Sequence, residues 1–160
     1  MGRTRAVRPP CAAPGRKDTA LKATLLLGDY ARVSEGKLDL VGAGWVVTGP
    51  EPASFGIGLL FSIEWHETNM EHPFVLDLLD ADGNPVINPE TDEPLFHFEG
   101  AMEVGRPPGM KSGTPQNGCL GLNLAAIPIP PGGRYEFRLV VDGDEDRAVS
   151  APFSTQPATP

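Results

Sequence analysis

Hydrophobic residues in this sequence recur at every second position within short runs, and glycine, proline and acidic residues separate the runs. The runs cover residues 23–33, 38–48, 55–65, 74–79, 85–88, 95–104, 119–129, 135–141 and 147–153. Alternation of this kind, with turn residues at close intervals, is typical of strands in a sandwich or barrel. No amphipathic helix of useful length is indicated. We therefore predict an all-β protein, an immunoglobulin-like antiparallel β-sandwich of about eight or nine strands.

Two segments depart from simple alternation. The run 55–65 is almost entirely apolar, which predicts a central strand that is covered on both faces. After it, Thr68 is followed three residues later by Glu71, the spacing of a capping box. One helical turn is therefore predicted after Thr68, and Pro73 ends it.

Length and composition indicate one folded unit. The chain has 160 residues, enough for a single domain, which we place at 22–156 with a short tail at 157–160. Residues 1–22 hold six basic side chains and one acidic side chain, together with several prolines. We interpret residues 1–21 as a disordered basic tail. A second interpretation is that this segment is a mis-called start and that the protein begins at Leu21.

Charge and apolar run length exclude two classes of partner. The whole chain carries a formal charge of −8. Residues 23–160 alone hold seven basic and 20 acidic residues, a net charge of −13, so the domain repels a phosphate backbone. No apolar run approaches the ~18 residues of a membrane span. Two cysteines are too few for a disulfide scaffold and fit a cytoplasmic location. We expect neither a nucleic-acid partner nor a membrane.

The segment 129–137 has the sequence Ile-Pro-Pro-Gly-Gly-Arg-Tyr-Glu-Phe and looks like the last hairpin of immunoglobulin-like sandwiches. In those proteins a Pro-Gly-x-Tyr corner places a tyrosine whose hydroxyl bonds back to the preceding backbone. The resemblance assigns structural roles to Gly132 and Tyr135. An extra glycine lengthens the corner in this chain.

Other segments are similar, in the same order, to an uncharacterised bacterial family known as a domain of unknown function. They are Lys22–Leu27, Gly36–Leu38, Gly42–Trp45, Trp65–Asn69, Leu79–Gly83, Gly105–Gly109 and the tyrosine corner. The resemblance covers most of residues 22–155 and implies a single-domain β-sandwich. It brings no known activity.

The segment His66-Glu67-Thr68-Asn69-Met70 begins like the helix of zinc proteases, but Met70 stands where a second histidine is required. His72 lies six residues after His66, about 240° around a helix, so the two cannot hold one metal from a single face. We favour a polar loop here. A metal-assisted hydrolase that uses His66, His72 and Glu67 stays open as an alternative.

Residues 80–84 echo the first half of a calcium loop, although Thr91 stands where the loop requires glutamate. Turn formation alone explains these residues. A calcium-dependent sandwich stays open as a further alternative, with ligands of the type of Asp77, Asp80, Asp82 and Asp144. The sequence contains no Gly-x-Ser-x-Gly and no phosphate loop. We assign no catalytic residue, no cofactor and no metal ligand.

Trp65 ends the apolar run and opens a polar loop, where an aromatic residue can anchor a protein interface. A second candidate surface is the stiff proline-rich loop 106–115. The candidate partner-binding residues are Trp65, Glu67, Asn69, Arg106 and Met110. We therefore predict a non-enzymatic binding module whose partner is another protein or a second copy of the chain.

Overall fold

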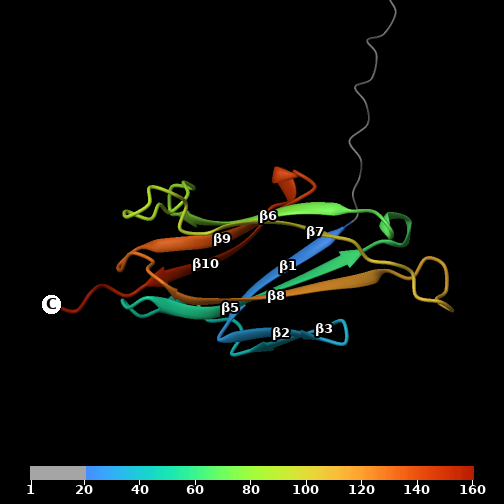
Figure 1. Cartoon of the computed structure of the whole chain (residues 1–160), viewed down its shortest axis with the longest axis horizontal. Helices are drawn as coiled ribbons and strands as arrows, with labels where there is room; N and C mark the ends of the chain where they lie inside the picture. The colour runs from blue at the N-terminus through green and yellow to red at the C-terminus, as the bar shows by residue number, and fades with distance from the viewer. Residues whose placement is uncertain (1–20) are drawn as a thin grey trace, which may run out of the picture.

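The computed structural model describes residues 21–160 and confirms an all-β protein (Figure 1). The elements are β1 (Lys22–Gly28), β2 (Tyr30–Ser34), β3 (Lys37–Val41), β4 (Val47–Thr48), β5 (Ala53–Ile63), η1 (Trp65–Glu67), β6 (His72–Asp80), β7 (His97–Met102), β8 (Gln116–Ile127), β9 (Arg134–Val141), η2 (Glu145–Arg147) and β10 (Val149–Thr155). Both interpretations of the basic N-terminal segment concern residues outside this range, apart from Leu21.

The strands form two facing sheets and one hairpin. One sheet has the order β1-β5-β8 and the other the order β4-β10-β9-β6-β7. Neighbouring strands are antiparallel except β4, which runs parallel to β10. The hairpin β2–β3 lies outside the three-stranded sheet, on the side away from the five-stranded one (Figure 1).

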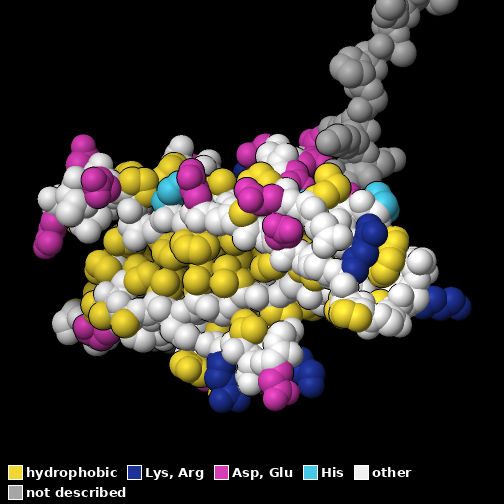
Figure 2. Space-filling view, turned by 45° about the vertical axis from the view of Figure 1, so that its right-hand side comes forward, with side chains coloured by type: hydrophobic (Ala, Val, Ile, Leu, Met, Phe, Trp, Pro, Cys, Tyr) yellow, Lys and Arg dark blue, Asp and Glu magenta, His cyan; other side chains and the backbone are white. Residues whose placement is uncertain are grey.

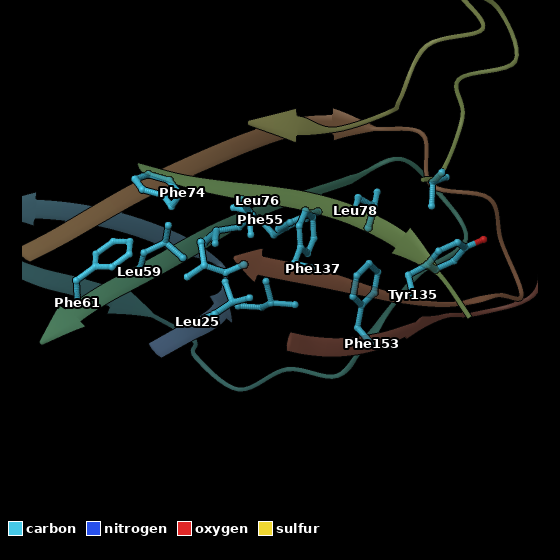
Figure 3. Packing of buried hydrophobic residues seen from close by; sticks show 14 of the residues in the cluster. Leu25, Phe55, Leu59, Phe61, Phe74, Leu76, Leu78, Tyr135, Phe137 and Phe153 are labelled. Atoms are coloured by element: carbon cyan, nitrogen blue, oxygen red, sulfur yellow. The ribbon is translucent and has the colours of Figure 1, made fainter. Parts of the chain in front are cut away.

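Aromatic and aliphatic side chains from both sheets fill the space between them (Figure 3). Phe137 of β9 is fully buried, and its ring centroid lies 5.5 Å from that of Phe55 on β5 and 5.8 Å from that of Phe153 on β10. Such edge and stacked contacts add to the transfer free energy of the buried apolar area. Leu21 is only 8% exposed and belongs to this core, so it is part of the folded unit.

Strand β5 is covered on both faces, which confirms the prediction for the apolar run. Its inner side chains enter the core, and its outer face carries the hairpin β2–β3. Glycines permit this close approach: a Cβ added to Gly56 would lie 2.5 Å from the backbone nitrogen of Ala31, and one added to Gly58 would lie 2.9 Å from Leu38.

An asparagine on β8 binds the hairpin to the sheet. Nδ2 of Asn123 donates to the carbonyl oxygen of Ala31 at 2.7 Å, and Oδ1 accepts from the Ala31 nitrogen at 2.9 Å. Ala31 is 2% exposed, so its backbone groups need partners within the protein. The amide of Asn123 thus takes the place of a neighbouring strand.

Three predicted strands differ from the observed ones. The run 23–33 is broken at Asp29, where the chain leaves the sheet to start the hairpin. The run 38–48 is divided into β3 and β4. The predicted strand 85–88 contributes only two isolated bridges, Leu79 to Pro85 and Ile87 to Pro94. Alternation identified extended backbone correctly but not the sheet to which each part belongs.

The tyrosine corner is present. The hydroxyl of Tyr135 donates to the carbonyl oxygen of Pro130 at 2.9 Å, which confirms the predicted bond, and Thr155 donates to the same oxygen at 2.8 Å. Gly132 adopts a φ of +76° and donates its N–H to Gln156. The extra glycine has a clear reason, because a Cβ on Gly133 would overlap the ring and hydroxyl of Tyr135.

We predict that Asn123→Ala lowers the free energy of unfolding by about 2 kcal/mol, because it removes two hydrogen bonds to buried backbone groups. Urea unfolding measures the loss, and hydrogen exchange should show faster exchange in residues 30–41. Asn117→Ala is the control, since Asn117 is exposed on the same face of β8. An Asn123→Ala variant as stable as the wild type would show that the amide does not hold the hairpin.

For the corner, we predict a loss of about 1 kcal/mol for Tyr135→Phe, which deletes one hydrogen bond and keeps the ring. Gly133→Ala should destabilise the protein by about 2 kcal/mol, because its methyl group forces the tyrosine out of position. The double variant should lose less stability than the sum of the two single losses, since both substitutions act on the same contact. If the two losses add fully in thermal or urea unfolding, Gly133 does not act through the hydrogen bond of Tyr135.

Candidate interaction surface

The two loops predicted as partner-binding surfaces lie together at one end of the molecule (Figure 1). The first contains η1 and leads to β6. The second joins β7 to β8. The backbone N–H of Asn69 donates to the carbonyl oxygen of Val104 at 2.9 Å, which joins the loops just before Arg106. Asn69 has a φ of +59°, a conformation that asparagine adopts more readily than most residues.

Arg106 completes the junction. Its guanidinium carbon lies 4.5 Å from the ring centroid of Trp65, a cation–π contact. Nη2 donates to the carbonyl oxygen of Trp65 at 2.7 Å, and Nε donates to the hydroxyl of Thr68. A planar guanidinium can stack and donate at once, whereas a lysine ammonium cannot. Two predicted residues that lie 41 positions apart are therefore in direct contact.

We call this region the Trp65–Arg106 surface and define it by Trp65, Asn69, Met70, Arg106 and Met110. Met70 and Met110 are carried by the two joined loops and are 45% and 39% exposed. The sequence analysis missed Met70, because its place in the zinc-protease comparison drew attention to the missing histidine rather than to the methionine. Flexible, polarisable methionines are common on binding surfaces.

The capping-box prediction is wrong. The helical turn η1 ends at Glu67, and Thr68 follows it as the C-terminal cap rather than preceding a turn as the N-cap. The Thr68 hydroxyl donates back to the carbonyl oxygen of Trp65 at 2.7 Å. Thr68 therefore closes the turn and also accepts from Arg106, which explains why it is 3% exposed in a loop.

His72 anchors the first loop from beneath. It is 3% exposed, with Nδ1 2.9 Å from Oδ2 of Asp142 and Nε2 3.2 Å from the carbonyl oxygen of Glu67. Both partners are acceptors, so the protonated imidazole, in which both ring nitrogens donate, is the form that satisfies both contacts. Burial lowers the pKa of His72, but the bonds to Asp142 and to the Glu67 carbonyl outweigh it and leave the pKa raised.

The prediction that Glu67 contacts a partner is corrected by its burial. Glu67 is 6% exposed and is the last residue of η1, so its side chain is enclosed by the protein. Its negative charge instead helps to raise the pKa of His72. Sequence reasoning placed it at the surface because glutamate is seldom buried.

The residues proposed for a hydrolytic metal are not arranged as ligands. His66 is exposed, and both ring nitrogens of His72 already contact oxygen atoms of Asp142 and Glu67. Within residues 21–160, no group of three or more His, Cys, Asp or Glu side chains is placed to hold a metal ion.

The predicted calcium ligands also serve local structure. Oδ1 of Asp80 accepts from the backbone nitrogens of Asp82 and Asn84, both at 2.9 Å, as in an Asx turn. Asp77 contacts His97, and Asp144 lies 3.7 Å from Arg147. These contacts account for three of the four carboxylates without an ion.

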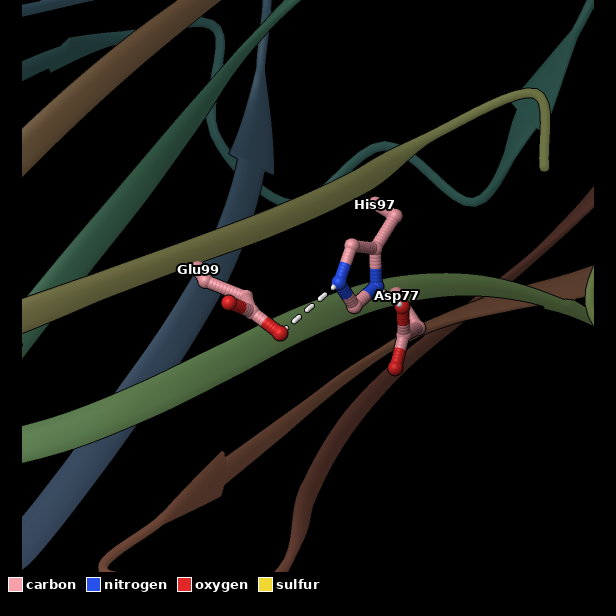
Figure 4. A network of polar contacts seen from close by, with 3 residues as sticks. All are labelled: Asp77, His97 and Glu99. Carbon is pink, nitrogen blue, oxygen red and sulfur yellow. Dashed lines mark hydrogen bonds and ion pairs between the residues drawn. The ribbon is translucent and has the colours of Figure 1, made fainter. Parts of the chain in front are cut away.

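A second polar cluster lies on the outer face of the five-stranded sheet and was missed by the sequence analysis (Figure 4). His97 of β7 places Nδ1 against Asp77 of β6 and Nε2 3.2 Å from Glu99. The bonds to Asp77 first, and then to Glu99, raise the pKa of His97. A signal was available, because His97 and Glu99 are two residues apart in a strand and therefore share a face.

The fold and this surface define a small all-β protein with two facing sheets and a joined loop surface at one end. Residues 23–153 match the family of unknown function DUF6941, and the chain belongs to this family. This confirms the resemblance to an uncharacterised domain family. No curated protein matches the sequence. Within residues 21–160, no helix has the length and apolar character needed to cross a membrane.

We predict that the free energy of unfolding falls as pH rises past about 6.5, the value for an unfolded histidine. The pKa of His72 is raised in the folded state, so the native protein holds the extra proton and gains stability below that pH. The gain disappears as pH passes through the higher folded-state pKa. Urea unfolding between about pH 5.5 and 8.5 measures this slope.

His72→Gln should abolish most of this dependence on pH. His97→Gln should retain most of it, because the side chain of His97 is 45% exposed and its ion pairs are screened by solvent. The prediction is wrong if the free energy of unfolding of the wild type rises as pH increases over this range. It is also wrong if the dependence on pH persists in His72→Gln.

Proposed function

We propose that this protein is a non-enzymatic binding module that recognises another protein through the Trp65–Arg106 surface. The observation that carries the proposal is the stack of Arg106 on Trp65, which brings two separate loops into one fixed arrangement. Tryptophan and arginine are the residue types that dominate binding energy at protein interfaces.

The arrangement of the loops favours binding. Loops that are already held by hydrogen bonds lose less conformational entropy when a partner docks. The Asn69–Val104 bond, the Arg106 bonds and the His72 anchor each restrain the surface from a different side. The exposed methionines then offer apolar area beside a cation, a combination suited to a partner with both apolar and acidic groups.

We further propose an immunoglobulin-like sandwich in a bacterial cytoplasm. The Tyr135–Pro130 bond supports the first part, since such a corner is a feature of immunoglobulin-like folds. Cys119, a free thiol, agrees with a reducing compartment. The acidic balance of the chain disfavours nucleic acid as the partner.

Site-specific photo-crosslinking tests the proposal. A photoreactive phenylalanine analogue is placed at Met110, and in a matched chain at Ile87, which is 44% exposed and is carried by the loop between β6 and β7 at the other end. Each chain is irradiated in its native host. We expect a discrete protein adduct from position 110 and none from position 87.

Adding Asn69→Ala and Arg106→Ala to the position-110 chain should remove the adduct. Arg106→Ala deletes the stack on Trp65 and the side-chain hydrogen bonds to the first loop. Asn69→Ala keeps the backbone bond to Val104 but removes the exposed amide and disfavours the positive φ at this position. Thermal unfolding must first show that this variant is folded. If position 110 gives no adduct, if both positions give the same one, or if a folded variant keeps it, the Trp65–Arg106 surface is not the binding site.

A further inference from the structure

The guanidinium of Arg106 uses only part of its donor capacity within the protein. A guanidinium carries five N–H groups in one plane. Nε donates to the Thr68 hydroxyl and Nη2 to the Trp65 carbonyl oxygen, and these two acceptors are themselves 2.7 Å apart, so both lie along the edge that Nε and Nη2 share. Nη1 makes no hydrogen bond to any of residues 21–160. The edge formed by Nη1 and the second N–H of Nη2 is therefore open.

This open edge is held in a fixed position at the surface. One face of the guanidinium lies on the Trp65 ring, 4.5 Å from its centroid, and the two bonds along the other edge prevent the group from turning in its plane. Arg106 is nevertheless exposed. The entropy lost by fixing a long side chain is therefore lost on folding, and a ligand that binds the open edge does not lose it again.

The shape of the open edge selects the chemical group that it binds. Its two N–H groups are parallel and match the two oxygens of a carboxylate, whereas a neutral carbonyl group offers one oxygen and no charge. A chain-terminal carboxylate is usually enclosed by a row of backbone N–H groups. Pro107 and Pro108 follow Arg106 directly and have no N–H, so the loop offers no such row there. The open edge therefore suits the side chain of an aspartate or glutamate.

The amide of Asn69 offers a second contact beside Arg106. A Cβ added to Gly105 would lie 3.7 Å from Oδ1 of Asn69, so this amide lies next to the residue that precedes Arg106. Asn69 is exposed, and its side chain makes no hydrogen bond within the described part of the chain. Elsewhere in the protein, the amide of Asn123 binds both the N–H and the carbonyl oxygen of Ala31. Asn69 can hold one residue of an extended partner in the same way.

Charge restricts the partner further. The second loop carries Arg106 and Lys111, and no acidic residue occurs between Glu103 and Glu136. The first loop carries acidic residues, however, and the whole chain has a charge of −8. A run of acidic residues is repelled by most of the domain, while a single carboxylate can reach the open edge. Figure 2 shows basic and hydrophobic side chains next to each other at the end that carries the loops. Apolar residues beside the carboxylate therefore fit this surface.

We propose that the Trp65–Arg106 surface binds an extended peptide segment in which one aspartate or glutamate is flanked by apolar residues. The carboxylate accepts from the open edge of Arg106, and the adjoining backbone pairs with the amide of Asn69. The apolar residues cover Met70 and Met110, which are 45% and 39% exposed. This inference rests on the proposed function, because it names the class of partner that the same surface binds.

Peptide display on the full chain tests the proposal. Short random peptides, fused at their carboxyl ends so that no terminal carboxylate is free, are selected on the wild type and counter-selected on Arg106→Ala. We expect the enriched peptides to carry an aspartate or glutamate beside aliphatic or aromatic residues. In a synthetic copy with an amidated carboxyl end, replacing this acid by its amide should raise the dissociation constant about tenfold or more, because charge-assisted hydrogen bonds are lost.

Three variants separate the open edge from charge alone. Arg106→Gln and Lys111→Gln each remove one exposed cation from the second loop. Arg106→Gln should raise the dissociation constant of the acidic peptide about tenfold or more, and Lys111→Gln less than about twofold. Arg106→Lys keeps the charge but has no planar pair of N–H groups, so it should also weaken binding about tenfold. Thermal unfolding shows whether each variant is folded. If no Arg106 variant folds, the exchange of acid for amide on the wild type decides.

The results distinguish this inference from the proposed function. If peptides bind through Arg106 but show no preference for an acid, the carboxylate partner is wrong and the proposed function stands. If Arg106→Lys binds as tightly as the wild type, or if Lys111→Gln weakens binding as much as Arg106→Gln, the open edge does not select the carboxylate. If no peptide is enriched, the inference is wrong, and photo-crosslinking at position 110 still decides the proposed function. Peptides that bind the wild type and a folded Arg106→Ala variant equally would contradict both.

Discussion

The burial of β5 on both faces is the constraint on which the rest of the structure depends. One face needs an opposing sheet, which β6, β9 and β10 supply with Phe137 at the centre. The other face has no side chain at Gly56 and Gly58, so the segment that covers it must lie directly against the backbone of β5. The hairpin β2–β3 meets that need, and Asn123 supplies the hydrogen bonds that its buried backbone lacks.

The burial of β5 and a few polar contacts also position the two loops that carry the Trp65–Arg106 surface. Trp65 follows β5 by two residues, so the burial of that strand determines where the indole ring lies. His72 begins β6 and holds the preceding turn through Glu67, while Asp142 balances its charge from the end of β9. Arg106 then joins the second loop to this base. The partly buried contact between His72 and Asp142 thus supports the loop that carries an exposed surface.

Local sequence patterns predict which residues form strands and corners, but they do not show contacts with residues that are distant in the sequence. The apolar run 55–65 was enough to predict a doubly covered strand, and the corner motif was enough to predict the bond of Tyr135. The break at Asp29 depends on glycines that lie more than 25 residues away, so alternation continued through it. Glu67 was predicted to face a partner and Thr68 to begin a helical turn, because the contacts of this segment with His72 and Arg106 cannot be read from the local sequence.

The contact between Ala31 and Asn123 has a consequence for the order in which the protein is made. The two residues are 92 positions apart, and the hairpin is synthesised before both of the strands that it covers. Leu38 and Leu40 therefore lack their contact with Gly58 until β5 has been made, and the Ala31 backbone lacks its Asn123 partner until β8 has been made. Contacts of such long sequence separation slow folding and prolong the exposure of apolar surface. The hairpin is therefore complete before β5 and β8 exist, and it cannot take its final place until both strands have followed it along the chain.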